Sequence, residues 1–95
     1  MSVEIRVKIT NRLGLHARAA ARLVNLANQY KSEIQIVRLD NFANADGKSI
    51  LSVIFLAAVQ GTELLIKATG EDEEAVLVAL VQLVRGKFGE ETDVF

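Results

Sequence analysis

Residues 3–27, VEIRVKITNRLGLHARAAARLVNLA, join two hydrophobic patterns of different period. In residues 3–9 apolar side chains alternate with charged ones, which is typical of a strand with one buried face. From about Ala17 the apolar positions recur at i, i+3, i+4 and i+7, which predicts an amphipathic helix. The period changes across residues 11–14. We therefore expect a loop there, with Gly14 allowing a tight turn before the helix.

Three more strands are predicted downstream. Residues 33–39 are rich in Ile and Val, and turn chemistry at Asp40 and Asn41 joins them to a short return strand over residues 42–46. Residues 63–68 alternate again and are expected to form the fourth strand.

Two more helices complete the predicted elements. Ser49 can cap a short helix over residues 50–58, and Asp72 with its acidic neighbours opens a last helix that ends at Gly86. The acidic tail, residues 90–95, is predicted to be loose. The apolar stripe of the last helix is predicted to consist of Ala75, Val76, Ala79, Leu80, Leu83 and Val84.

The predicted elements follow the order β-α-β-β-α-β-α within residues 1–95. Such an order in a short chain without repeats or a linker indicates one α+β domain, a sheet with its helices on one face. The order of the strands within that sheet is not readable from the pattern, because strands joined through a helix need not be neighbours.

Composition narrows the function classes. An apolar fraction of 51% with 24% charged residues is typical of a soluble globular protein. No apolar run approaches the roughly 18 residues of a membrane helix, and the first residues lack a signal-peptide pattern, so we expect a cytoplasmic protein without membrane insertion. One histidine and no cysteine disfavour a metal site. A net charge of −1 gives no support to nucleic-acid binding.

His16, the only histidine, lies immediately before the predicted first helix. A neutral imidazole is a nucleophile near physiological pH. A phosphoryl group on this ring would meet the free amides and the positive dipole end of the helix. Arg18, two residues on, would add a guanidinium fork. The segment therefore has the parts of a transient phosphohistidine site.

The local pattern also fits a second interpretation. A lone histidine at a helix N-terminus is often a solvated surface residue, and Arg18 taken alone is often a surface charge. The residues by themselves leave both interpretations open.

Three segments resemble a known family. NRLGLHARAAARLV, residues 11–24, is similar to the active-site segment N-x-x-G-L-H-A-R-P-A of HPr, the histidine-containing phosphocarrier of bacterial phosphotransferase systems. GKSILSVIFLAA, residues 47–58, resembles its second motif, K-S-I-M-G-V-M-S-L. VQGTELLIKATGEDEEAVLVAL, residues 59–80, resembles its closing pattern, G-x-x-[LI]-x-[IL]-x-A-x-G-x-D-E-x-x-A. The spacing of the three blocks agrees with the family, so the resemblance covers the whole chain.

This resemblance implies a fold and a mechanism. The fold would be an open-faced sandwich, four antiparallel strands covered on one face by three helices. Phospho-enzyme I, charged by phosphoenolpyruvate, would donate a phosphoryl group to His16, usually to Nδ1, and a IIA protein or domain would accept it. Arg18 and the first-turn amides would hold the phosphate. The chain would be a monomeric carrier rather than an enzyme, with no cofactor and no bound metal.

Two positions depart from the family pattern. Ala19 replaces the proline that follows the arginine, so the helix should still start here but with less preorganised backbone. Phe55 stands where many sugar-type carriers have a small or polar residue and nitrogen-type paralogues often have a larger apolar one. The sugar-transport and nitrogen-regulation branches both remain open.

Ser49 has two predicted roles. It is expected to be the N-cap of the short second helix. In part of the family an HPr kinase/phosphorylase modifies the serine at this position, so Ser49 is also a candidate for regulatory phosphorylation.

Two other function classes fit the sequence less well. A regulatory relative would dock to transcription factors or enzymes without obligatory phosphoryl transfer, but relatives of that kind lose the histidine that this chain keeps. An RNA-binding module of similar element order is disfavoured by the aromatic fraction of 5% and the acidic pI.

The short second helix has more apolar side chains than one buried stripe requires. The residues expected to face inward are Val53, Leu56 and Ala57. The residues expected to form an exposed docking patch near His16 are Ile50, Leu51 and Ile54, with Phe55 at the edge. Such a patch suits a partner that approaches closely and leaves quickly, and the resemblance implies that enzyme I meets this helix with an acidic surface. The alternative is that the helix is fully buried beneath the acidic tail.

Overall fold

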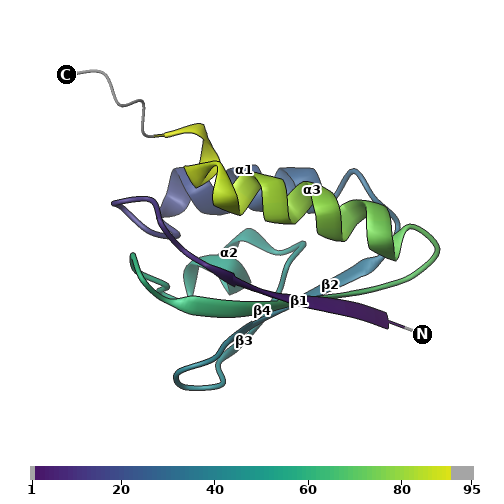
Figure 1. The fold of residues 1–95 in the computed structure, drawn as a ribbon, viewed down its shortest axis with the longest axis horizontal. Coiled ribbons are helices and arrows are strands. Elements are labelled where there is room, and N and C mark those ends of the chain that lie inside the picture. Colours follow the sequence, from purple (N-terminus) through teal and green to yellow (C-terminus); the bar gives the residue numbers. More distant parts are fainter. Residues whose placement is uncertain (1, 91–95) are drawn as a thin grey trace.

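The computed structural model describes residues 2–90, which form a four-stranded antiparallel sheet with three α-helices on one face (Figure 1). The strands are β1 (Ser2–Lys8), β2 (Glu33–Arg38), β3 (Asn44–Asp46) and β4 (Glu63–Thr69). The helices are α1 (Ala17–Ala27), α2 (Ile50–Ile54) and α3 (Glu73–Arg85), and a 3-10 helix, η1 (Lys87–Gly89), follows α3. The predicted α+β open-faced sandwich is confirmed.

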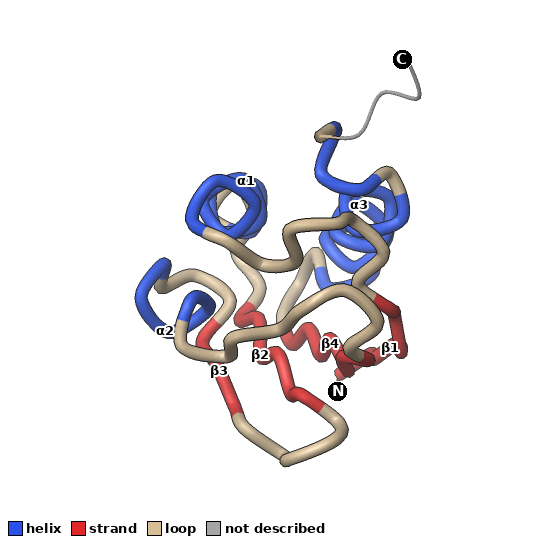
Figure 2. The backbone as a smooth tube through the Cα atoms, turned by 90° about the vertical axis from the view of Figure 1, so that its left-hand side faces the viewer, coloured by secondary structure: helices blue, strands red, loops and turns tan. Residues whose placement is uncertain are grey.

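The strand order is β1-β4-β2-β3, so β4 lies between β1 and β2. Ile66 at the middle of β4 is opposite Ile5 on one side and Ile36 on the other. Alternate side chains of the sheet therefore meet in one apolar layer on the helix side. The end view in Figure 2 shows the sheet beneath α1 and α3, with α2 beside α1 near β3.

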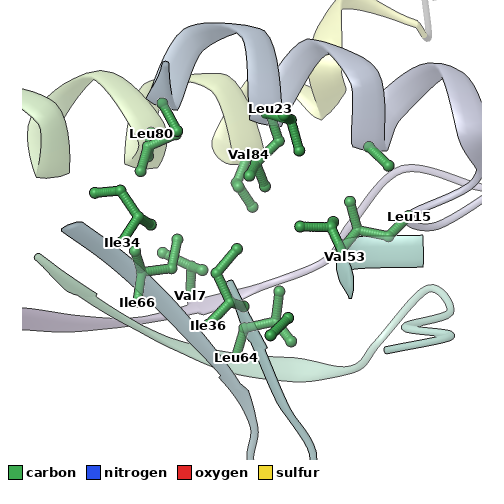
Figure 3. Close-up of a cluster of buried hydrophobic side chains, with 14 of the residues drawn as sticks. Val7, Leu15, Leu23, Ile34, Ile36, Val53, Leu64, Ile66, Leu80 and Val84 are labelled. Carbon is green, nitrogen blue, oxygen red and sulfur yellow. The ribbon is translucent and has the colours of Figure 1, made fainter. Parts of the chain in front are cut away.

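The core lies between the helices and the sheet (Figure 3). The apolar spacing in the first helix predicts a buried stripe of Ala20, Leu23, Val24, Ala27 and Tyr30. The first four are buried, whereas Tyr30 lies beyond the end of α1 and is half-buried. Fully buried side chains of the close-up include Leu23, Leu80, Val84, Ile36, Leu64 and Ile66.

The stripe predicted for α3 is partly wrong. Val76, Leu80 and Val84 are buried as expected, but Ala75 is exposed and Val81 is buried in its place. α3 packs against β1, and in this orientation the helix buries the branched side chain of Val81 instead of Ala75. Burying more carbon surface stabilises the fold more.

Two element ends differ from the prediction by at least two residues, and one element was not predicted. α2 stops at Ile54 instead of residue 58, because Ala57 adopts a left-handed φ of 52° that a helix cannot continue. β3 is shortened because Phe42, at φ 59°, belongs to the turn after β2. η1 was not predicted. Within residues 2–90 no helix combines the length and the hydropathy needed to cross a bilayer.

Candidate functional site

His16 is the N-cap residue of α1, with an extended backbone at φ −72° and ψ 179°. The first helical bond runs from the Ala20 N–H to the His16 carbonyl at 2.8 Å. The N–H groups of Ala17, Arg18 and Ala19 have no acceptor among residues 2–90. The imidazole makes no capping bond, and 29% of the side chain is exposed. An accessible ring therefore lies beside three free amides at the positive end of a helix.

The helix start is kept without the family proline. Ala19 is fully buried in the first turn of α1, and the helix begins at Ala17 as predicted. Packing of this alanine into the core supports the first turn.

The loop before His16 is tied to the segment that follows α2. Gly14 has a φ of 68°, and a Cβ there would lie 2.5 Å from the Ala58 carbonyl oxygen. The Leu15 N–H donates to that same oxygen at 2.8 Å. Asn11 closes the loop from the other side, since its Nδ2 donates to the Gly14 carbonyl at 2.8 Å. These contacts fix the direction from which the chain enters α1.

Glu90, just beyond η1, completes the surroundings of the ring. Its Oε2 contacts Nε2 of His16, and its Oε1 accepts a hydrogen bond from Asn11 Nδ2 at 2.8 Å. The Glu90 side chain is only 10% exposed. Neither Asn11 nor Glu90 was predicted as a site residue. The prediction that Glu90 belongs to a loose tail is wrong for this residue, while residues 91–95 lie outside the described part of the chain.

The segment that carries Glu90 is held against α1. Phe88 is buried in the core at 1% exposure, and its carbonyl accepts a hydrogen bond from Arg22 Nη1. Lys87 and Phe88 both have left-handed backbones, at φ 58° and 56°. This tight reversal after α3 returns the chain to the start of α1, where Figure 1 shows it in yellow.

Arg18 is exposed in the first turn of α1 and makes no hydrogen bond or ion pair within residues 2–90. Arg18 follows His16 by two residues, and within residues 2–90 no hydrogen bond joins its guanidinium to the imidazole. From Ile9 to Tyr30 the chain carries Arg12, Arg18 and Arg22 and no acidic residue.

The apolar patch on α2 is exposed. Leu51 and Phe55 are 62% and 78% exposed and Ile50 is also exposed, whereas Ile54 is half-buried. Val53 and Leu56 face the core, as predicted. The alternative of a fully buried helix is wrong. The inward prediction for Ala57 is also wrong, because its left-handed backbone turns it to solvent.

The patch lies at the same end of the molecule as His16, since α2 is packed against α1 and Leu15 bonds to the segment after α2 (Figures 1 and 2).

Ser49 is the N-cap of α2, as predicted. Its Oγ accepts a long hydrogen bond of 3.4 Å from the Ser52 N–H. The preceding Lys48 is held by its Nζ, which donates to the Tyr30 carbonyl at 2.6 Å. The half-buried Ser49 hydroxyl thus lies at the N-terminal edge of the exposed patch.

Charged groups outside the site stabilise loops. The Ser32 hydroxyl and the Lys31 and Ser32 amides donate to Asp72, which lowers the pKa of that carboxyl below its usual 3.8. The Arg38 guanidinium lowers the pKa of Asp40 in the same way.

Comparison with known proteins identifies the family. Residues 3–86 match the sequence model described as "PTS HPr component phosphorylation site". Phosphocarrier protein HPr of Pseudomonas aeruginosa is 43% identical over 86 residues, which cover 90% of this chain and 94% of that protein. Phosphocarrier protein NPr of Escherichia coli K12 is 34% identical over 91 residues, covering 96% and 100%.

Solved structures of HPr proteins have the same fold as this chain. The crystal structure of HPr-C-His from Thermoanaerobacter tengcongensis superposes with a TM-score of 0.88 at 38% identity, covering 95% of this chain and 99% of that one. An HPr dimer from the same organism gives a TM-score of 0.74 at 38% identity, covering 88% and 94%. The expected monomeric state is therefore not confirmed. The matching sequence pattern, the relatives and the fold together show that this chain belongs to the HPr family of phosphocarrier proteins of the phosphotransferase system.

Proposed function

We propose that this chain accepts a phosphoryl group on His16 from phospho-enzyme I and passes it to a IIA protein or domain of a phosphotransferase system. The observation that carries the proposal is the accessible His16 ring beside three amides at the N-terminus of α1 that have no acceptor among residues 2–90. These amides and the dipole suit a phosphate dianion.

The transfer needs positioning and electrostatics more than covalent catalysis. A lone pair of the imidazole attacks the phosphorus in line, and the bond between phosphorus and the donor histidine breaks. The first-turn amides of α1 and the unpaired Arg18 guanidinium stabilise the charge on the equatorial oxygens. The second transfer reverses these events toward the acceptor, so the protein is regenerated as a carrier and is not itself an enzyme.

The exposed patch of Ile50, Leu51, Ile54 and Phe55 is proposed as the docking surface for enzyme I and IIA partners. It is apolar, it is solvent-accessible and it lies on the helix beside α1. Phosphorylation of Ser49 by an HPr kinase/phosphorylase would place about two negative charges at its edge. A cytoplasmic location fits these partners.

The relatives include both an HPr and an NPr. The proposal therefore covers a sugar-transport or a nitrogen-regulation role.

Incubation with phosphoenolpyruvate and a heterologous enzyme I tests the central assignment. The wild-type protein is expected to gain one acid-labile phosphate by mass spectrometry, and His16→Ala is expected to gain none. The half-exposed His16 side chain makes no capping bond, so this variant should keep its fold by circular dichroism. Phosphate uptake by a folded His16→Ala protein would refute the assignment. A wild-type protein that takes up none would favour the regulatory docking role.

A further inference from the structure

The contact between His16 and Glu90 determines which ring nitrogen is free. A carboxylate can only accept hydrogen bonds, so a neutral imidazole in contact with Glu90 Oε2 must carry its single proton on Nε2. Nδ1 then has a lone pair, and within residues 2–90 it has no hydrogen-bond partner. The nucleophilic nitrogen of this ring is therefore Nδ1.

Glu90 is itself held in place from two directions. Asn11 is fully buried, and its Nδ2 donates at 2.8 Å both to the Gly14 carbonyl and to Glu90 Oε1. The second hold is the buried Phe88 ring two residues before Glu90, together with the hydrogen bond from Arg22 to the Phe88 carbonyl. One carboxylate oxygen is thus fixed on Asn11, which leaves the other directed at Nε2.

We propose that Glu90 is a positioning residue that keeps the proton on Nε2 of His16 through both phosphoryl transfers. This inference rests on the proposed carrier function and adds a role that lies outside the His-Ala-Arg segment. The arrangement resembles the carboxylate–histidine pairs that orient imidazoles in other reactive sites.

The proton balance shows why this contact matters. During uptake the Nδ1 lone pair forms the bond to phosphorus while the donor's N–P bond breaks, and the ring becomes a cation that still holds its Nε2 proton. Glu90 compensates that positive charge. During delivery the N–P bond breaks, its electron pair returns to Nδ1 and the ring becomes neutral with the proton still on Nε2. Neither step exchanges a proton with solvent.

Three variants separate this role from a structural one. In Glu90→Ala the acceptor at Nε2 is lost. In Glu90→Gln the amide oxygen is expected to accept from Asn11 Nδ2, so that the amide NH2 group faces Nε2 as a donor. Glu74→Ala removes an exposed carboxylate from α3 and serves as the matched control. Because the chain has a single histidine, the ring nitrogen signals in a ¹⁵N NMR spectrum belong to His16 alone.

The unphosphorylated proteins are compared at about pH 9, well above the ordinary imidazole value. Wild type and Glu74→Ala are expected to show the proton on Nε2, Glu90→Ala a mixture of both tautomers, and Glu90→Gln the proton on Nδ1. Phosphoryl uptake from enzyme I should slow about ten- to a hundredfold in Glu90→Ala, a range typical for loss of a histidine-orienting partner, and at least as much in Glu90→Gln.

A wild-type ring protonated on Nδ1, on both nitrogens, or identical in Glu90→Ala would overturn the proposal, whatever the transfer assay shows. Uptake by Glu90→Gln at the wild-type rate would also overturn it. A wild-type protein with the expected tautomer that takes up no phosphate would instead refute the proposed function, and the transfer role of Glu90 with it.

Discussion

Replacing Gly14 by alanine tests how the loop before His16 is held. Gly14 has a left-handed φ of 68°, and the added Cβ would lie 2.5 Å from the Ala58 carbonyl oxygen and 2.9 Å from Val59 Cα. Both distances are well inside van der Waals contact, and both neighbours are backbone atoms that cannot rotate away. We expect the loop and the segment after α2 to separate, which weakens the bond between the Leu15 N–H and the Ala58 carbonyl.

Gly61 provides the matched control. Its φ is also positive, at 92°, but a Cβ there meets nothing within 4 Å. Gly61→Ala therefore carries only the left-handed penalty, about 1–2 kcal/mol. Gly14→Ala adds the steric overlap, which costs about 1–3 kcal/mol in packed regions, for a total of about 2–5 kcal/mol. A domain of this size has roughly 5–14 kcal/mol of stability, so most of the population stays folded.

Urea unfolding followed by circular dichroism measures both free energies, and phosphoryl uptake from enzyme I measures the site. Gly14→Ala is expected to be the less stable variant and to transfer more slowly, because His16 follows the displaced loop. Gly61→Ala should transfer at the wild-type rate. Equal losses of stability in the two variants would refute the steric argument. A normal uptake rate in Gly14→Ala would show that this loop does not position His16.

Four further predictions concern the patch, the phosphate and the acid range. Leu51→Glu should slow uptake from enzyme I while changing the free energy of unfolding by no more than about 0.5 kcal/mol. The control Val53→Ala, whose side chain is buried in the same helix, should lower the free energy of unfolding in urea by about 2 kcal/mol. A Leu51→Glu protein that unfolds would mean that this face of the helix belongs to the core. Arg18→Ala should slow uptake roughly ten- to a hundredfold, the equivalent of about 1.5–3 kcal/mol for one charged hydrogen bond, and a wild-type rate would make it a mere surface charge. Ser49→Asp should weaken uptake without loss of thermal stability, and unchanged uptake would place the docking face elsewhere. The pKa of Asp72 in the folded state lies below 3.8, so wild type should have a larger free energy of unfolding in urea than Asp72→Asn above pH 3.8. This difference should disappear as the pH falls through the pKa of Asp72 in the folded state. A difference that persists in stronger acid would contradict the prediction.

The strands and α1 were predictable because their signals are local. Alternation in residues 3–9 and the spacing of Leu23, Val24 and Ala27 follow from the two backbone periods, and each decides which face is buried. The exposure of Leu51 was also predictable, since a short helix on a sheet cannot bury every side.

Errors arose where tertiary packing decided between equivalent local choices. Ala75 and Val81 lie on adjacent faces of α3, and only the position of β1 determines which of them is covered. The early end of α2 depends on the left-handed Ala57, a residue type with no preference for that conformation. The position of β4 between β1 and β2 likewise cannot be predicted from the local hydrophobic pattern.

The candidate site divides in the same way. The amides of α1 and Arg18 lie within a few residues of His16, so spacing alone places them beside the ring. Glu90 is 74 positions away in the sequence and reaches His16 only because Phe88 is buried and the backbone reverses after α3. A polar contact at that separation leaves no periodic signal. It follows that a change at Phe88, outside every recognisable motif, should act on His16 through the carboxylate that this side chain anchors.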